Sequence, residues 1–274
     1  MREQPSLGGE PLAEAIRRIG QPGFEAALWA MFEALCAPDN LIILAYRTAG
    51  PPVVLYCLTG AAPVFAQLEA TYLAGAYRLD PFYDLHLRAV PAGAYRLSDI
   101  APDAFQRSRY FLDYYHQTGL IDEITFIAYP AGGASLNICI GRDGTSARGF
   151  SAQDIGACQR IAPVIAALAE AQWAELARAS GPAEDTAAFL AEKAKARLGI
   201  HLSPRQAEVA LLILRGHSTV SIGLRLGLSP QTIKVFRRQL YARCRISSQA
   251  ELFGLMLPLM KEGSAPPAGL SPVA

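Results

Sequence analysis

The sequence has few of the residues that build metal sites and disulfide frameworks. Among its 274 residues there are five cysteines and four histidines. The cysteines are odd in number and widely spaced, and neither C-x-x-C nor H-E-x-x-H occurs. We therefore predict reduced thiols in a cytoplasmic protein, with no metal site and no cofactor.

Long apolar runs and catalytic signatures are also missing. No uninterrupted apolar run reaches the roughly 18–20 residues of a membrane-spanning helix, so no membrane partner is expected, and no secretory signal is recognisable. Neither a phosphate loop nor a G-x-S-x-G nucleophile elbow occurs. Cys139 could in principle act as a thiol nucleophile with His86 or His116 as base. A cysteine inside the apolar run LNICI is more typical of a core, so we predict no catalytic residue and no enzyme.

The chain as a whole has almost no excess of one sign of charge, since 25 Lys and Arg stand against 24 Asp and Glu and the net charge is only +1. Residues 1–200 contain 16 Lys and Arg against 21 Asp and Glu, whereas residues 201–274 contain 9 against 3. Within residues 201–250 the two counts are 8 and 1. The neutral total therefore combines an acidic body with a basic C-terminal segment, which favours a nucleic-acid partner for that segment.

Hydrophobic periodicity predicts an α/β domain in residues 1–180. Helical patterns cover 22–36, 64–77, 103–118 and 151–179, and extended runs cover 41–46, 53–58, 123–129 and 134–140. This order predicts an α-β-α sandwich with a sheet of four or five strands. The small, polar stretch 180–186 predicts a linker, and a short helix is predicted over 187–198. We assign residues 181–199 to the linker and this helix.

Four helices are predicted in residues 200–262, followed by a loose tail over 263–274. They cover 203–215, 219–226, 230–244 and a stretch from Ser248 that we expect to break near Pro258. Two short helices joined by a glycine-containing turn, the second of them basic, are typical of a helix-turn-helix. We predict that this all-α domain binds double-stranded DNA and that helix 230–244 reads it.

The runs LSPRQAEV, GHSTVSIGLRLGLSPQTIKVFRRQLYAR and SSQAEL resemble the C-terminal DNA-binding domain of LuxR-type transcription regulators. The resemblance covers about residues 200–257. It implies that Lys234, Val235 and Arg238 occupy the base-reading positions. It also implies that Ser229, Thr232 and Arg237 lie on the phosphate side. Family domains dimerise through the last helix, here Ala250–Met256, so the resemblance implies a homodimer.

Three positions of this domain depart from the residues usual in the family. Gln206 replaces a Glu, Gly223 replaces an Ala, and Phe236 replaces a His. Because these positions are structural ones, we expect the departures to affect the stability of the helices more than the binding of DNA.

Aromatic residues gather in the middle of the chain, where thirteen of the 24 lie within residues 65–129. Eight of these thirteen are tyrosines, and a buried tyrosine needs a partner for its hydroxyl. Such a stretch suits a small-molecule pocket with apolar walls and a few directional polar groups. A phosphoacceptor domain is rejected because LIILAYR carries no acidic pair. The predicted ligand-binding residues are Tyr72, Tyr77, Asp80, Tyr83 and Tyr95.

The segments YLAGAYRLDPF and GAYRLSD resemble the autoinducer-binding domain of LuxR-type receptors. The resemblance implies that Asp80 holds a ligand amide and that Tyr72 assists it. Tyr95 stands where the family has a Trp that binds the lactone carbonyl, which favours a ligand other than an ordinary acyl-homoserine lactone. The carboxylates lying among the tyrosines suit a cationic amine; they are Asp80, Asp84, Asp99 and Glu123.

Two alternatives remain open for the N-terminal domain. One is an acyl-homoserine lactone receptor for quorum sensing. The other is a domain that only dimerises, through an apolar seam on the helix predicted over 151–179. The residues of that seam would be Ile155, Ile161, Val164, Ile165 and Leu168.

Overall fold

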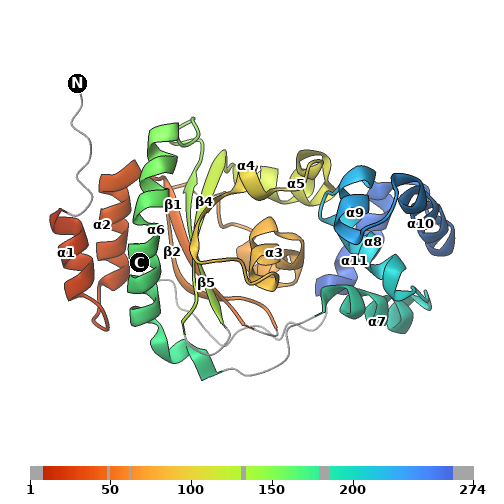
Figure 1. Cartoon of the computed structure of the whole chain (residues 1–274), viewed down its shortest axis with the longest axis horizontal. Helices are drawn as coiled ribbons and strands as arrows, with labels where there is room; N and C mark the ends of the chain where they lie inside the picture. Colours follow the sequence, from red (N-terminus) through yellow and green to blue (C-terminus); the bar gives the residue numbers. More distant parts are fainter. Residues whose placement is uncertain (1–8, 48–49, 62, 131–133, 179–184, 262–274) are drawn as a thin grey trace. The chain divides into compact units, whose positions relative to one another are not determined.

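The computed structural model describes residues 9–47, 50–61, 63–130, 134–178 and 185–261 (Figure 1). By its internal contacts the chain divides into two units. The first unit contains residues 1–65, 85–100 and 119–182, and the second contains residues 66–84, 101–118 and 183–274. Two segments of the tyrosine-rich stretch therefore belong to the same unit as the C-terminal helices.

A five-stranded antiparallel sheet forms the centre of the first unit, with the strand order β2-β1-β5-β4-β3. The strands are β1 (Asn40–Tyr46), β2 (Val53–Thr59), β3 (Gly93–Arg96), β4 (Asp122–Ala128) and β5 (Ser135–Arg142). The four strands predicted individually are present to within two residues at each end. The sequence missed β3 because four residues, GAYR, are too few to display the two-residue period of a strand.

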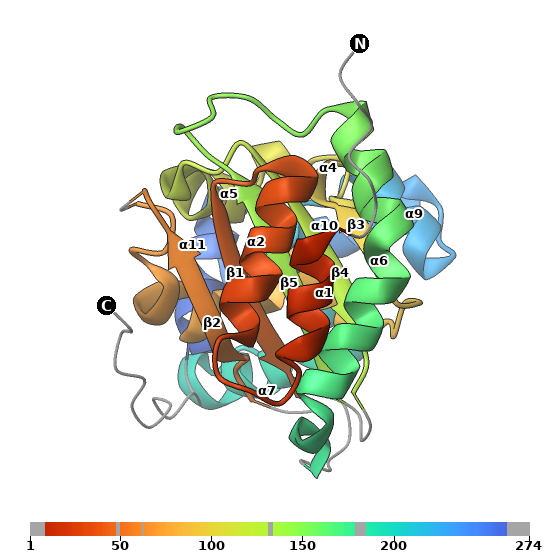
Figure 2. The same cartoon turned by 90° about the vertical axis from the view of Figure 1, so that its left-hand side faces the viewer.

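Helices of the first unit lie along one face of the sheet, as Figure 2 shows from the side of the helices. They are α1 (Glu10–Arg17), α2 (Phe24–Cys36) and α6 (Ala152–Gln172). Helix α6 begins with a capping box, in which the side chains of Ser151 and Asp154 each accept a hydrogen bond from the other residue's backbone N–H. The predicted α/β domain is thereby confirmed, although α1 was not predicted.

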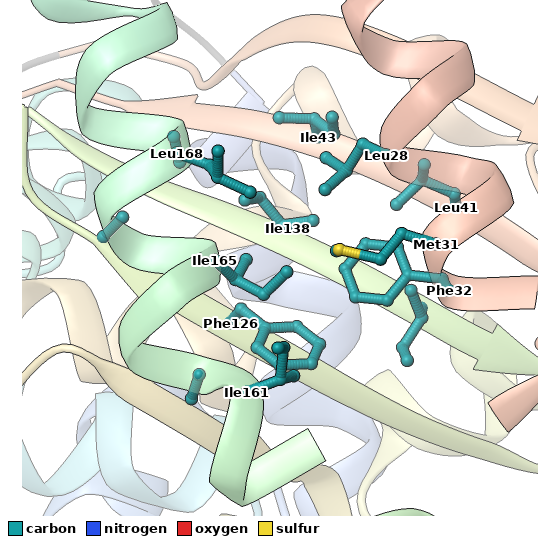
Figure 3. Close-up of a cluster of buried hydrophobic side chains, with 14 of the residues drawn as sticks. Leu28, Met31, Phe32, Leu41, Ile43, Phe126, Ile138, Ile161, Ile165 and Leu168 are labelled. Atoms are coloured by element: carbon teal, nitrogen blue, oxygen red, sulfur yellow. The ribbon is translucent and has the colours of Figure 1, made fainter. Parts of the chain in front are cut away.

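The core lies between these helices and alternate residues of the strands (Figure 3). Leu136, Ile138 and Ile140 of β5 contribute to it. Because successive strand residues point to opposite faces, Asn137 and Cys139 face away from this core. The alternation within residues 136–140 of β5 therefore separates an apolar face from a face that carries Asn137 and Cys139.

The core also corrects the predicted dimer seam on α6. Ile161, Ile165 and Leu168 are each at most 5% exposed and pack among the core side chains (Figure 3). They cannot meet a second copy of the chain without leaving the sheet. The apolar stripe that suggested a seam is instead the face with which α6 covers the sheet.

Short helical segments and five longer helices build the second unit. The short segments are the π-helical turn η1 (Leu68–Leu73), the 3-10 turns η2 (Ala76–Leu79), η3 (Phe105–Arg107) and η4 (Tyr115–Thr118), and α5 (Arg109–Asp113). The longer helices are α7 (Thr186–Leu198), α8 (Pro204–Leu214), α9 (Thr219–Leu226), α10 (Pro230–Cys244) and α11 (Gln249–Lys261). The predicted helical C-terminal region is confirmed. Two further helices, α3 (Pro81–Leu87) and α4 (Leu97–Ile100), and a 3-10 turn, η5 (Ala174–Arg178), complete the described elements.

Three helix predictions were wrong. The stretch 64–77 is interrupted at Gly75, whose φ of 153° lies outside the helical region. The stretch 103–118 is broken at Ser108, which is extended and caps α5 by accepting a hydrogen bond from Phe111 N. The last helix continues through Pro258, because Leu259 and Met260 beyond it are buried and packing outweighs the lost hydrogen bond.

Some predictions fall outside the described residues. They are most of the linker stretch 180–186 and the tail over 263–274. The predicted domain boundaries stay a prediction. Within the described ranges, no helix combines the length and the apolar character needed to cross a membrane.

Candidate DNA-reading surface and sensor residues

The turn between α9 and α10 is built from glycine and serine. Gly227 ends α9 in the left-handed conformation, with a φ of 65°. Ser229 then caps α10, since its Oγ accepts a hydrogen bond from Thr232 N at 3.0 Å. A Cβ at Gly223 would lie 2.6 Å from Leu228 O, so the chain passes closer here than an alanine allows. This close approach accounts for glycine at a position where alanine is usual.

Helix α10 has one buried face and one exposed face. The buried face consists of Ile233, Leu240 and Cys244. The exposed face presents the three residues predicted to read bases, Lys234, Val235 and Arg238. An exposed guanidinium on such a face is able to donate two hydrogen bonds to the edge of a guanine in the major groove.

The predicted phosphate-side residues lie near the N-terminal ends of two helices. Ser229 and Thr232 share a hydrogen bond of 2.8 Å between their hydroxyl oxygens at the start of α10. Arg237 is half-buried and extends to the start of α9, where its Nη1 donates to Thr219 Oγ1 at 3.4 Å. Its Nη2 donates to the hydroxyl of Tyr241 at 3.3 Å. Helix N-termini carry unpaired backbone N–H groups, so this arrangement suits a phosphate.

Gln206, another departure from the family pattern, completes a capping box at the start of α8. Ser203 Oγ accepts from Gln206 N at 3.2 Å, and Gln206 Oε1 accepts from Ser203 N at 3.1 Å. A neutral amide oxygen therefore makes the reciprocal bond that a glutamate makes. Phe236, the third departure, is half-buried on α10.

Asp80, the main candidate for ligand binding, is a partly buried carboxylate. The hydroxyl of Tyr72 donates to its Oδ2 at 2.7 Å, and Phe82 N donates to its Oδ1 at 2.8 Å. Burial disfavours the charged form and raises the pKa of Asp80 to about 6, against the opposing effect of these two bonds.

Two more candidate tyrosines are buried beside this carboxylate in the second unit. The rings of Tyr77 and Tyr83 meet edge to face with their centroids 5.0 Å apart. The ring of Tyr72 lies 6.4 Å from that of Tyr77. The structure thus brings four of the five predicted residues together. The fifth, Tyr95, lies on β3 of the first unit and donates its hydroxyl hydrogen to Pro91 O at 2.7 Å.

Asp84 forms an ionic cluster that sequence reasoning missed. Arg215 Nη1 donates to Asp84 Oδ1 at 2.8 Å, and Arg225 Nη2 lies 3.0 Å from Oδ2. Arg215 also donates through Nε to Arg78 O at 3.1 Å. Two guanidinium groups therefore balance the charge of Asp84, which removes it from the carboxylates proposed for an amine. The partners are 131 and 141 residues away, so no local pattern could have indicated them.

Close backbone contacts join the same segments to the C-terminal helices. A Cβ on Gly75 would lie 2.2 Å from Met260 O, and Arg78 Nη1 donates to that same oxygen at 2.9 Å. At another contact, Ala104 N donates to Gly216 O at 3.0 Å. Segments 66–84 and 101–118 are therefore bonded to α11 and to the α8–α9 connection.

His217, in the α8–α9 connection, is neutral over a wide pH range. Burial lowers its pKa to about 4, and the positive charge of Arg225 acts in the same direction. Its Nδ1 lies 2.7 Å from Ser221 Oγ. A neutral histidine at this point adds no charge to the cluster around Asp84.

Comparison with known proteins identifies the family. Residues 201–256 match the family described as "Bacterial regulatory proteins, luxR family". The chain is also 30% identical over 185 residues to "Putative HTH-type transcriptional regulator in exeN 3'region" from Aeromonas salmonicida. That alignment covers 65% of this chain and 93% of the relative. The chain belongs to the LuxR family of bacterial regulatory proteins.

This LuxR-family chain is therefore a DNA-binding transcription regulator, and the family is not one of enzymes. Its helix-turn-helix region binds DNA, as the basic segment and the exposed face of α10 predicted.

The fold of the N-terminal part is similar to the VqsR LBD domain from Pseudomonas aeruginosa. The two share 23% identity with a TM-score of 0.51, and the likeness covers 60% of this chain and 97% of that one. A likeness to SdiA from Escherichia coli covers 91% of this LuxR-family chain and 97% of the SdiA chain, at 14% sequence identity. The TM-score of 0.39 makes that likeness too distant for a comparison of sites.

Proposed function

We propose that this LuxR-family regulator binds a small molecule through its N-terminal domain and changes its binding to DNA in response. The observation that carries this proposal is the partly buried carboxylate of Asp80, which accepts a hydrogen bond from the hydroxyl of Tyr72 and whose pKa is raised to about 6. Burying a carboxylate costs free energy, and a ligand that donates a hydrogen bond or brings a positive charge offsets that cost. The similarity to the VqsR LBD domain agrees with this role.

The proposed ligand contacts are Tyr72, Tyr77, Asp80, Tyr83 and Tyr95. We favour an amine-like metabolite over an ordinary acyl-homoserine lactone, because tyrosine replaces tryptophan at position 95 and aromatic faces attract cations. With Asp84 paired to two arginines, Asp80 is the carboxylate among the tyrosine rings best placed to meet a cation. Quorum sensing through an acyl-homoserine lactone is the alternative.

On the DNA side, α10 reads bases through Lys234, Val235 and Arg238. Phosphates are bound by Ser229, Thr232 and Arg237. The regulator acts in the cytoplasm as a homodimer, with one recognition helix from each copy about one helical turn of DNA apart, so that the operator is two-fold symmetric. Residues 1–180 form the sensor domain, 181–199 the linker with its short helix, 200–262 the DNA-binding domain and 263–274 a tail.

Calorimetry on the full-length protein tests the ligand class. Octylamine and N-octanoyl-homoserine lactone are titrated into the wild type, into Asp80→Asn and into the control Asp99→Asn, whose carboxylate is exposed. We expect heat with the amine in the wild type and the control, and none in Asp80→Asn. Heat with the lactone alone contradicts the amine.

The thermal transition then separates a sensor from a domain that only dimerises. A ligand that binds the folded state stabilises it by RT ln(1 + [L]/Kd), where [L] is the free ligand concentration, and therefore raises the melting temperature. A pure dimerisation domain shows no such rise with any small molecule, and its melting temperature depends on protein concentration alone.

A further inference from the structure

The guanidinium group of Arg237 connects two hydroxyl groups, one on α9 and one on α10. Its Nη1 donates to Thr219 Oγ1 at 3.4 Å, and its Nη2 donates to Tyr241 Oη at 3.3 Å. The guanidinium carbon also lies 5.9 Å from the centre of the Tyr241 ring, within reach of a cation–π attraction. These contacts hold a long side chain in one place, although all three residues are only half-buried.

Helical spacing and the packing of α9 against α10 bring the three side chains together. Arg237 and Tyr241 are four residues apart on α10, so they lie on the same face of that helix. Thr219 is the first residue of α9, directly after Ser218, which caps the helix. The exposed Arg238 follows Arg237 in the chain, so the cluster borders the face proposed to read bases.

Both hydroxyl groups accept a bond from Arg237 and keep their own hydrogen for donation. In the part of the chain that the structure describes, neither Thr219 nor Tyr241 donates that hydrogen to another protein atom. A hydroxyl that accepts a bond from a cation is polarised, and this makes it a stronger donor. Two such donors around one guanidinium, on a partly exposed surface, suit an anion.

The surrounding charge and the family indicate which anion this is. Residues 201–250 contain 8 Lys and Arg against 1 Asp or Glu, and residues 201–256 match a family of DNA-binding regulators. Arginine, threonine and tyrosine side chains are common donors to the phosphate oxygens of DNA. A backbone phosphate therefore fits the cluster in both charge and hydrogen bonding.

We propose that Thr219 and Tyr241 each donate a hydrogen bond to one DNA phosphate, and that Arg237 orients both hydroxyls while it balances the phosphate charge. The inference rests on the proposed role of Arg237 and adds two uncharged donors to it. Because the guanidinium is already held before DNA arrives, little side-chain entropy is lost when the phosphate binds.

A carboxylate beside the cluster offers an independent probe of where the phosphate binds. Asp103 Oδ1 accepts a hydrogen bond from Ser218 N at 2.9 Å, one residue before Thr219, and both segments belong to the second unit. Its negative charge opposes a phosphate at Thr219. An asparagine keeps the accepting oxygen and removes the charge, so Asp103→Asn should bind DNA about two- to fivefold more tightly at low salt.

Fluorescence anisotropy of the full-length protein with a labelled duplex of arbitrary sequence tests the proposal, because phosphate contacts do not depend on the bases. Titrations at several KCl concentrations give the affinity and the slope of log K against log salt. Thr219→Val and Tyr241→Phe each remove one hydroxyl and no charge. We expect each to lower the affinity about tenfold for each bound copy and to leave the slope unchanged, whereas Arg237→Ala lowers both.

Two control variants separate the hydroxyls from general effects of substitution. Thr219→Ser keeps the hydroxyl, and Tyr129→Phe removes a hydroxyl that donates to Val90 O in the first unit. We expect wild-type affinity and slope in both. Misfolding is able to mimic a loss of affinity but not the gain expected in Asp103→Asn, for which Asp99→Asn is the matched control with unchanged affinity.

The outcomes separate this proposal from the proposed function. Wild-type affinity in Thr219→Val or in Tyr241→Phe, with a reduced slope in Arg237→Ala, overturns the shared phosphate and leaves the contact of Arg237 standing. A slope that changes in the hydroxyl variants means that they act by displacing the guanidinium, which also overturns the two donors. Wild-type affinity in Asp103→Asn places the phosphate away from Thr219 and overturns the proposal, and wild-type binding by Arg237→Ala contradicts the proposed function as well.

Discussion

The carboxylate of Asp84 lies 2.8 Å from Nη1 of Arg215, so an acidic residue from the middle of the chain neutralises a buried arginine at the end of α8. Asp84 follows Asp80 by one helical turn, and Asp84 N donates to Asp80 O at 3.2 Å. The proposed ligand contact and the ionic partner of the DNA-binding region therefore share one turn of backbone.

Replacing Asp84 by asparagine should destabilise the protein. The substitution leaves Arg215, whose side chain is 7% exposed, without its carboxylate. Removing one partner of a buried ion pair costs about 3–5 kcal/mol, and we expect a value near the lower end because Arg215 keeps its bond to Arg78 O. Urea unfolding of the full-length protein measures this loss.

Asp99→Asn is the matched control, because Asp99 is an exposed acid of the same type. We expect its free energy of unfolding to stay within about 0.5 kcal/mol of the wild-type value. Equal effects of the two substitutions would show that the cluster around Asp84 contributes nothing specific.

Asp80 should make the stability depend on pH in a defined window. Its folded pKa of about 6 lies above the ordinary value of 3.8, so the folded state binds the proton more tightly than the unfolded state. The stabilisation is fully present below about pH 4 and is lost as the pH rises to about 6. Two units of pKa correspond to about 3 kcal/mol.

Unfolding of the wild type and of Asp80→Asn between pH 3.5 and pH 7.5 isolates this contribution, because the other groups titrate alike in both proteins. We expect the wild type to lose stability relative to Asp80→Asn across the window. A difference that is flat with pH would mean that Asp80 titrates normally.

Substitutions of the two neighbouring arginines of α10 should impair DNA binding in different ways. Arg238 is exposed on the face proposed to read bases, so Arg238→Ala should cost about 1–3 kcal/mol at one base pair of each half-site and relax the preference there. Arg237 extends toward the start of α9, so Arg237→Ala should weaken all sequences about equally and reduce the slope of log K against log salt by about 0.9.

Fluorescence anisotropy with specific and scrambled duplexes at several salt concentrations distinguishes the two outcomes. If either variant binds both duplexes as the wild type does, the proposed role of that arginine is wrong.

Gly75→Ala should detach segment 66–84 from the last helix. An alanine Cβ would lie 2.2 Å from Met260 O, on backbone whose φ of 153° already excludes most side chains. We expect a loss of at least about 2 kcal/mol in the free energy of unfolding. The control is Gly20→Ala, where φ is also positive but nothing lies within 4 Å, and where about 1–2 kcal/mol is expected.

Hydrogen exchange gives a second readout for the same pair. Gly75→Ala should increase exchange at the C-terminal end of α11, and Gly20→Ala should leave it unchanged. Similar stability losses with no local change in exchange would contradict the contact between Gly75 and Met260.

Elements held by neighbours in the sequence were predictable. Ser229, Gly227 and the capping box of Ser203 act within four residues, so the helices of the DNA-binding region began and ended close to the predicted positions. The two-residue period of the strands likewise located four of the five. The broken stretch 64–77 was not predictable, because an unusual backbone angle at Gly75 accompanies a contact 185 residues away.

The sequence by itself determined the family, the bounds of the helix proposed to read DNA and the separation of an acidic body from a basic C-terminal segment, because these depend on local spacing and composition. Tertiary structure alone decided that Asp84 pairs with Arg215 and Arg225. It also decided that the amide of Asn40 is paired, whereas that of Asn137 has no hydrogen-bond partner among the described residues. The physical reason is the same in both cases. Whether a buried polar group is satisfied depends on which distant atoms lie within about 3 Å of it.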